Sequence, residues 1–193
     1  MGALSIPDFR RFDIECAEFR FASWKGLMES AMTMPKAKQW PKWFALAAVI
    51  VLLDQLSKIY FNGNYQYGEV REVIPGFFGF TLLYNPGAAF SFLHDAGGWQ
   101  KYLFSGLAFA VSGWLGWNIF KNRFSGLMNL AAAFIMGGAL GNVIDRIVHG
   151  HVIDFIQVHY YSSWSYPAFN LADSFICVGA ALMVLDSFRK PRA

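Results

Sequence analysis

Charged residues are scarce in this chain: only 15% of its 193 residues are Asp, Glu, Lys or Arg, against about 25% in an average soluble domain. Hydrophobic residues make up 55% and aromatic residues 18%. This balance excludes a disordered chain and argues against a soluble enzyme. It is typical of a protein whose outer surface contacts lipid and whose aromatic side chains lie at the membrane interfaces.

Cysteine is also rare, and neither positive nor negative charge is in large excess. The net charge is +3 and no long basic stripe is present, so we expect no nucleic-acid partner. The two cysteines, Cys16 and Cys177, form no disulfide framework or metal-binding pattern. No His-Glu-x-x-His or Gly-x-Ser-x-Gly motif accompanies the four histidines, which disfavours zinc and serine hydrolases. We expect no metal and no cofactor.

Four apolar runs predict membrane-spanning helices. A helix rises about 1.5 Å per residue, so each run reaches close to the roughly 30 Å hydrocarbon core of a bilayer. The predicted spans are residues 43–61, 102–120, 127–147 and 171–188.

The basic residues predict the orientation, because cytoplasmic flanks are enriched in Lys and Arg. The connections 62–100 and 148–170 contain Arg71 as their only Lys or Arg, so we expect them to lie outside the cell and both termini to be cytoplasmic. The basic residues on the other side are Lys36, Lys38, Lys42, Lys121, Arg123, Arg189, Lys190 and Arg192.

The first outer connection reads as strand rather than helix. Apolar and β-branched residues at 70–73, 77–84 and 90–92 are interrupted by Pro-Gly pairs, which mark turns. We therefore predict an all-α membrane protein with four transmembrane helices, a small extracytoplasmic β-sheet and both termini cytoplasmic.

Residues 1–35 differ in character from the four-span domain at 36–193, because they are mixed in charge and have no long apolar run. Three interpretations stay open. The segment is an amphipathic helix at the membrane interface, a dispensable extension, or an over-extended reading of a chain that starts at Met32 or Met34.

Two charged residues interrupt the first span. Asp54 and Lys58 are four residues apart, hence on one helix face, and can neutralise each other. A charge at mid-bilayer costs about 2.5–3.5 kcal/mol on insertion scales. The pair is therefore a functional candidate, and a helix-packing ion pair is an equal alternative.

The end of the third span carries small and polar residues at three- and four-residue spacing, which places them on one stripe facing protein. Gly137 and Gly141 form a small-xxx-small pair that lets another helix approach. Taken alone, the stripe favours packing and anchoring of the helix end. Its members are Gly138, Gly141, Asn142, Asp145 and Arg146.

Asp154 and Asp173 lie at the same predicted membrane boundary. Two carboxyl groups brought together away from solvent share a proton, and one pKa rises. One carboxylate can then activate water while its protonated partner polarises a carbonyl group. The alternative is that Asp173 caps the fourth helix and Asp154 caps a turn. Asp186, three and four residues before Arg189 and Lys190, indicates a surface ion pair.

Taken together, these residues resemble the lipoprotein signal peptidase family, also called signal peptidase II, from about Trp43 to Arg189. Five segments occur in the family's order, and residues 1–35 lie outside the pattern. The segments are 53–58 (LDQLSK), 84–91 (YNPGAAFS), 137–146 (GGALGNVIDR), 150–155 (GHVIDF) and 167–174 (PAFNLADS).

The resemblance implies a bacterial inner-membrane aspartic endopeptidase with its active site at the periplasmic side. It would remove the signal peptide from diacylglyceryl-modified prolipoproteins, just before the lipid-bearing cysteine. Apart from the resemblance, we expect membrane lipids as partners and a functional monomer. The resemblance matches Asp154 and Asp173 to the catalytic pair. Residues matching substrate-binding or supporting positions are Asp54, Lys58, Asn85, Gly87, Asn142, Asp145, Arg146, Asn170 and Ala172.

Two other classes would also place acids in a membrane. A proton-coupled transporter buries carboxylates, but four spans with the acids at one face give no pathway through the membrane. A non-catalytic scaffold needs only the glycine stripe. The sequence does not indicate which of the two Asp residues carries the shared proton, because a coupled pair titrates as a unit.

Overall fold

The computed structural model describes residues 39–87, 98–161 and 163–189, which belong to a single compact unit, Gln39–Ala193. Four helices and four strands lie within the described residues. In chain order they are α2 (Trp40–Asn64), β1 (Val70–Ile74), β2 (Phe78–Asn85), α3 (Gln100–Phe120), α4 (Gly126–Val148), β3 (Val152–Tyr160), β4 (Trp164–Ser165) and α5 (Leu171–Ser187). The predicted extension 1–35 lies outside the described residues.

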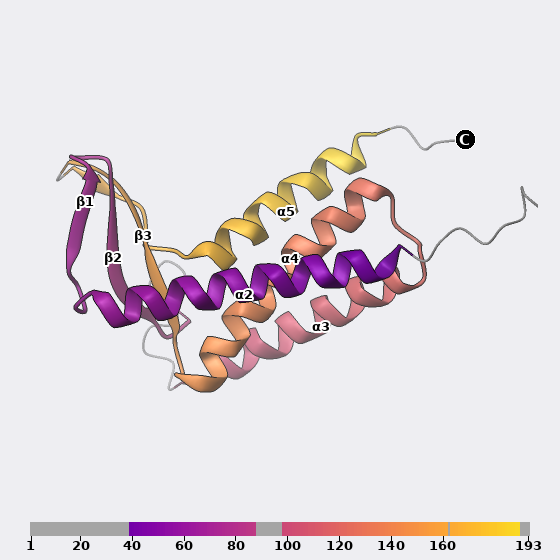
Figure 1. Cartoon of the computed structure of the whole chain (residues 1–193), viewed down its shortest axis with the longest axis horizontal. Coiled ribbons are helices and arrows are strands. Elements are labelled where there is room, and N and C mark those ends of the chain that lie inside the picture. The colour runs from indigo at the N-terminus through magenta and orange to yellow at the C-terminus, as the bar shows by residue number, and fades with distance from the viewer. Residues whose placement is uncertain (1–38, 88–97, 162, 190–193) are drawn as a thin grey trace, which may run out of the picture. The chain divides into compact units, whose positions relative to one another are not determined.

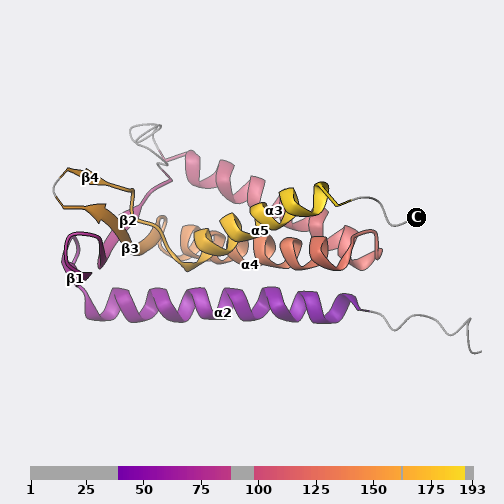
Figure 2. The same cartoon turned by 90° about the horizontal axis from the view of Figure 1, so that it is seen from above.

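Helix α4 is the central helix and packs against α2, α3 and α5 (Figures 1 and 2). Its glycines make this possible. A Cβ on Gly137 would lie 2.7 Å from Ile50 Cβ of α2, and one on Gly138 would collide with the Ala172 carbonyl oxygen of α5. The predicted packing role of the glycine stripe is confirmed.

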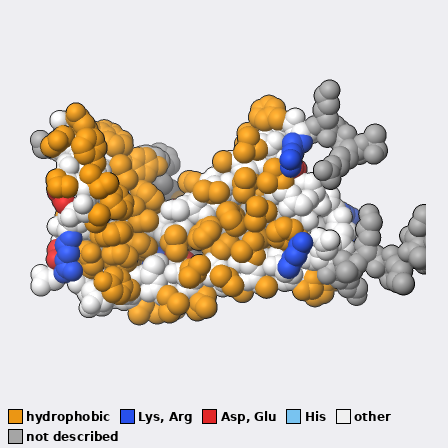
Figure 3. Space-filling model, turned by 45° about the horizontal axis from the view of Figure 1, so that its top comes forward, with side chains coloured by type: hydrophobic (Ala, Val, Ile, Leu, Met, Phe, Trp, Pro, Cys, Tyr) orange, Lys and Arg blue, Asp and Glu red, His pale blue; other side chains and the backbone are white. Residues whose placement is uncertain are grey.

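Three helices, α2, α3 and α4, are long and apolar enough to cross a membrane among the described residues. They cover the first three predicted spans: α2 is three residues longer at each end, α4 is one residue longer at each end, and α3 begins two residues earlier and ends at the predicted residue. Helix α5 has 17 residues, a rise of about 26 Å, so the fourth span stays a prediction. Hydrophobic side chains cover much of the visible surface, while Lys and Arg side chains gather toward its ends (Figure 3).

The strands form one antiparallel sheet in the order β1-β2-β3-β4. It lies beside the end of the helices where α2 stops and α5 begins (Figure 1). Phe61 of α2 stacks on Phe155 of β3 with ring centroids 4.2 Å apart, which joins the helices to the sheet. The predicted small sheet is confirmed, but the strand expected at residues 90–92 lies outside the described residues.

Strand β3 was not predicted from the sequence. It runs for nine residues through the second outer connection and pairs with β2, with Asp154 opposite Leu83. The interpretation of Asp154 as the cap of a turn is therefore wrong. Asp154 is the third residue of β3 and lies in the buried first half of the strand.

Candidate active site

Asp154 is 3% exposed and its carboxylate is held by two side-chain amides. Asn85 Nδ2, at the end of β2, donates to Asp154 Oδ2 at 3.1 Å. Asn170 Nδ2 donates to Asp154 Oδ1 at 2.7 Å. Strand β3 and the residue before α5 thus meet at this carboxyl group.

Asp173 lies in the first turn of α5 and takes part in its cap. Asn170 is the N-cap residue, and its Oδ1 accepts from the Asp173 backbone N at 3.0 Å. In return, Asp173 Oδ2 accepts from the Asn170 backbone N at 3.3 Å. The predicted capping role of Asp173 is confirmed, and because Asn170 also binds Asp154, the cap positions Asp173 beside Asp154.

Asn142 of α4 completes a continuous network between the two acids. Its Nδ2 donates to Asp173 Oδ1 at 2.7 Å, and its Oδ1 accepts from Asn170 Nδ2 at 3.1 Å. In both Asn142 and Asn170, the amide nitrogen donates a hydrogen bond and the amide oxygen accepts one. The orientation of these two side chains is therefore fixed. Rigid placement of carboxyl groups is what proton-transfer chemistry needs.

Burial, and then the negative charge of Asp173, raise the pKa of Asp154 to about 7. The hydrogen bonds from Asn85 and Asn170 act in the opposite direction, because they stabilise the ionised form. A carboxyl group with a pKa near neutrality can hold a proton at physiological pH and release it readily.

A second buried cluster surrounds Lys58. Its Nζ lies 2.8 Å from Asp54 Oδ2 and 2.9 Å from Asp145 Oδ2, and it donates to Asn142 Oδ1 at 2.9 Å. The predicted Asp54–Lys58 pair is confirmed. Asp145 is 1% exposed and shares this lysine, so its role extends beyond the predicted anchoring of the helix end.

The Lys58 cluster also holds the two backbone segments that carry the acids. Asp54 Oδ1 accepts from the backbone N of Ala172 at 3.0 Å, the residue before Asp173. Asp145 Oδ2 accepts from the backbone N of Ile153 at 3.1 Å, the residue before Asp154. One lysine therefore supports both candidate catalytic residues through two carboxylates.

Gln55 belongs to this cluster and was not singled out in the sequence. Its Nε2 lies within hydrogen-bond distance of Asp145 Oδ1 (2.9 Å), the Gly141 carbonyl oxygen (3.1 Å) and Asp54 Oδ2 (3.2 Å). The available signal was its place inside the segment LDQLSK. An amide beside a charge in an apolar helix needs a partner inside the protein.

Gly87 and Arg146 border the site. Gly87 has φ +112°, a conformation that favours glycine, and its backbone N donates to Asn85 Oδ1 at 2.9 Å. This bond orients the Asn85 amide toward Asp154. Arg146 donates to the Asn142 carbonyl oxygen at 3.2 Å and lies 5.5 Å from the ring centroid of Phe104.

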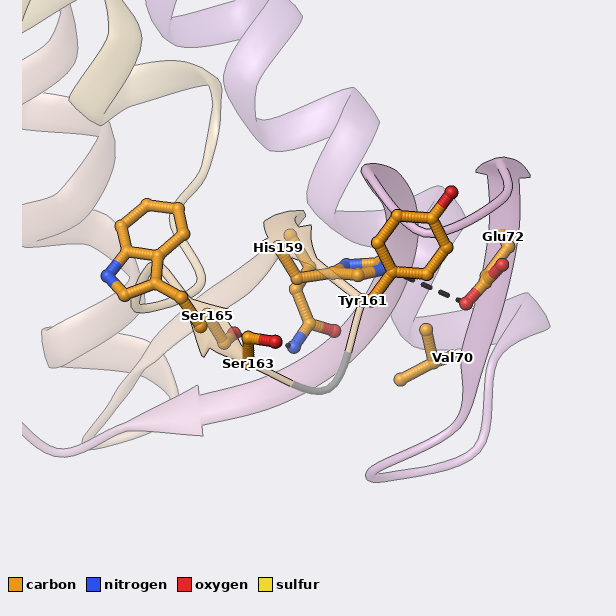
Figure 4. Close-up of a pocket in the computed structure, with 8 residues that line it drawn as sticks. Val70, Glu72, His159, Tyr161, Ser163 and Ser165 are labelled. Atoms are coloured by element: carbon orange, nitrogen blue, oxygen red, sulfur yellow. Dashed lines mark hydrogen bonds and ion pairs between the residues drawn. The ribbon is translucent and has the colours of Figure 1, made fainter.

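Two cavities accompany these elements. One of about 270 Å³ adjoins Asp173. A larger one of about 410 Å³ lies on the sheet and includes Gln157 and His159, the latter 3.5 Å from Glu72 (Figure 4). Side chains alternate along a strand, so these two residues face away from the side of β3 that carries Asp154. The larger cavity is therefore separate from the acids.

Asp186 lies at the opposite end of α5 from Asp173 and accepts a hydrogen bond from Ser125 Oγ at 2.8 Å. Of its two predicted partners, Lys190 lies outside the described residues. Among the described residues, no ion pair joins Asp186 to Arg189, so that part of the predicted pairing is wrong.

Long apolar helices with buried acidic residues gathered where the bundle meets the sheet define a helical membrane protein. Solved bacterial membrane enzymes have a similar fold. One, determined by the in meso method at 2.3 Å resolution, matches with a TM-score of 0.67 at 28% identity, over 79% of this chain and 94% of that one.

The chain belongs to the signal peptidase II family. Its residues 46–189 match the family model described as "Signal peptidase (SPase) II". The lipoprotein signal peptidase of Chromobacterium violaceum is 80% identical over 160 residues, which are 83% of this chain and 99% of the relative. That of Neisseria meningitidis serogroup C is 57% identical over 76% of this chain and 88% of the relative. The protein is thus a peptidase of a bacterial membrane.

Proposed function

We propose that this protein is an aspartic endopeptidase that removes the signal peptide from diacylglyceryl-modified prolipoproteins, cutting just before the lipid-bearing cysteine. The observation that carries the proposal is the bridge from Asp154 through Asn170 and Asn142 to Asp173. The relatives, which are lipoprotein signal peptidases, support the choice of substrate.

In the proposed mechanism, Asp154 is the protonated partner and Asp173 the ionised one, in line with the pKa of Asp154 near 7. Asp173 takes a proton from water as the water oxygen attacks the scissile carbonyl carbon, and Asp154 gives its proton to the carbonyl oxygen. The tetrahedral intermediate then returns a proton to Asp154 while Asp173 protonates the leaving nitrogen. The C–N bond breaks, one water is consumed, and the pair again holds one proton.

The same proposal places the protein in the inner membrane as a functional monomer with four spans. The sheet and the acids would lie on the periplasmic side, where the cysteine-linked lipid is accessible from the outer leaflet. The described basic residues Lys42, Lys121, Arg123 and Arg189 flank the opposite helix ends, which supports cytoplasmic termini.

The proposal is tested by incubating purified protein in detergent with a diacylglyceryl-modified prolipoprotein peptide and with the same peptide lacking the lipid. We expect cleavage of the modified peptide and little of the other. Equal cleavage of both would contradict the proposed specificity. Proton-dependent uptake into vesicles without any cleavage would favour a transporter, and neither activity would favour a scaffold.

Activity should depend on pH through Asp154. One shared proton is required, so kcat/KM should fall by about tenfold per pH unit above the pKa, which lies near 7. The Asn85 hydrogen bond lowers that pKa, so Asn85→Ala should raise it and move the alkaline limb to higher pH. A limb that stays in place or moves to lower pH would contradict the assignment of the proton to Asp154.

Topology gives a further prediction. A reporter that is active only in the periplasm should be active when fused after Ser163 and inactive when fused after Asn122 or at the C-terminus, because basic residues flank the latter positions. Activity of the C-terminal fusion would reverse the orientation and place Asp154 and Asp173 on the cytoplasmic side.

The segment 1–33 should be dispensable for cleavage. The C. violaceum relative is matched over 99% of its length by 160 residues of this chain, so part of this chain has no counterpart there. A protein starting at Met34 should retain activity close to that of the full chain, since it keeps every residue of both clusters. Loss of activity in a truncated protein that accumulates normally would give the segment a working role.

A further inference from the structure

The cavity of about 270 Å³ beside Asp173 has a mostly apolar wall. Tyr166 and Phe169 contribute aromatic rings from the segment before α5, and Ser174 and Cys177 come from α5 itself. The Ser174 hydroxyl already donates to the Asn170 carbonyl oxygen at 3.0 Å. The cavity thus suits an apolar group that lies next to the candidate catalytic carboxyl group.

Given the proposed function, the substrate must carry an apolar group close to Asp173. The nitrogen of the scissile bond belongs to the lipid-bearing cysteine, whose sulfur is three bonds away. With ordinary bond lengths near 1.5 Å, the sulfur lies within about 4–5 Å of the bond that is cut. The diacylglyceryl group therefore begins close to Asp173, and at least one of its acyl chains needs apolar space there.

The cavity leads toward the surface that would face lipid. Cys177 is exposed, and farther along α5 Val184 and Leu185 are 55% and 57% exposed. An acyl chain leaving past Cys177 would pass along apolar side chains. A cavity of roughly 150 Å³ holds a benzene molecule, so 270 Å³ accommodates several methylene groups.

We propose that this cavity binds the first methylene groups of one acyl chain of the substrate, and that Cys177 forms its outer wall, where the chain passes into the bilayer. The inference rests on the proposed function and assigns a specificity role to residues that do not touch the reacting atoms. Tyr166 and Phe169 would contact the chain nearest the glyceryl group.

Filling the cavity tests the proposal. Cys177→Trp should lower kcat/KM for a dipalmitoylglyceryl substrate by roughly tenfold or more, the effect of displacing about two methylene groups. A diacetylglyceryl substrate should be affected within about twofold, because it has no long chain to displace. Val178→Trp, at the next and 48% exposed position, is the matched control and should be nearly silent. Equal losses for the two substrates, or for the two variants, would overturn the proposal.

A binding measurement separates this inference from the proposed function. The Asp154→Asn variant is incubated with a substrate carrying a photoreactive group near the glyceryl end of one acyl chain, and crosslinked peptides are identified by mass. We expect crosslinks to the segment containing Phe169 and Cys177. Crosslinks confined to α2 or α3 would overturn the proposal even if the wild-type protein cleaves, whereas failure of the wild type to cleave would count against the proposed function alone.

Discussion

Replacing Lys58 by methionine should destabilise the protein by about 3–5 kcal/mol, the typical cost of removing one partner from a buried ion pair. The Lys58 ammonium group contacts Asp54, Asp145 and Asn142 at 2.8–2.9 Å. Methionine keeps the length of the side chain but leaves two carboxylates without their cation. In a thermal melt this corresponds to a decrease in Tm of roughly 6–20 °C at about 2–4 °C per kcal/mol.

The matched control is Lys121→Met, since the Lys121 side chain is exposed and lies over the Trp117 and Phe120 rings. Its Tm should change by about a degree or two, as for most surface substitutions. Adding Asp54→Asn and Asp145→Asn to Lys58→Met should restore part of the lost stability by removing the unpaired charges. A Lys58→Met protein that melts like the wild type would contradict the structural role of this cluster.

Much of the fold could be predicted because it depends on local sequence. Hydropathy locates α2, α3 and α4, which are long and apolar, and the pair Gly137 and Gly141 indicates the close approach of a neighbouring helix. Asp54 and Lys58 are four residues apart, so their pairing follows from helix geometry alone.

The remaining features depend on contacts distant in sequence. Strand β3 is paired along β2, more than sixty residues earlier in the chain, and its alternation does not distinguish it from a loop with apolar residues. The contact of Lys58 with Asp145 spans two helices, and Gln55 reaches Gly141 and Asp145 across the same interface. Such contacts are fixed by tertiary packing, so neither periodicity nor spacing predicts them.

Replacing either acid of the proposed pair should nearly abolish cleavage. Asp154→Asn and Asp173→Asn preserve side-chain size but remove a group that takes up and returns a proton. General acid–base catalysis contributes about 10²–10⁴-fold, so each variant should lose at least that much activity. An amide at position 154 faces the donors Asn85 and Asn170, and one at position 173 faces the donor Asn142. Each amide mismatches some hydrogen bonds, and we expect a cost of about 1–3 kcal/mol in stability, which a thermal melt measures separately.

The control for this pair is Asp186→Asn, at the far end of α5. Its amide oxygen can still accept from Ser125 Oγ, the partner of Asp186 at 2.8 Å, so activity should stay within about twofold of wild type. The double variant Asp154→Asn, Asp173→Asn should be little worse than either single one, because residues that act as a unit give non-additive losses.

The most direct test is the mass of the products formed by each purified, folded protein from a diacylglyceryl-modified prolipoprotein. The wild type and Asp186→Asn should release a signal peptide whose mass places the cut immediately before the lipid-bearing cysteine, while Asp154→Asn and Asp173→Asn should return the substrate intact. Substantial release of the same peptide by either folded Asn variant would contradict the aspartic mechanism and leave the two acids as structural residues.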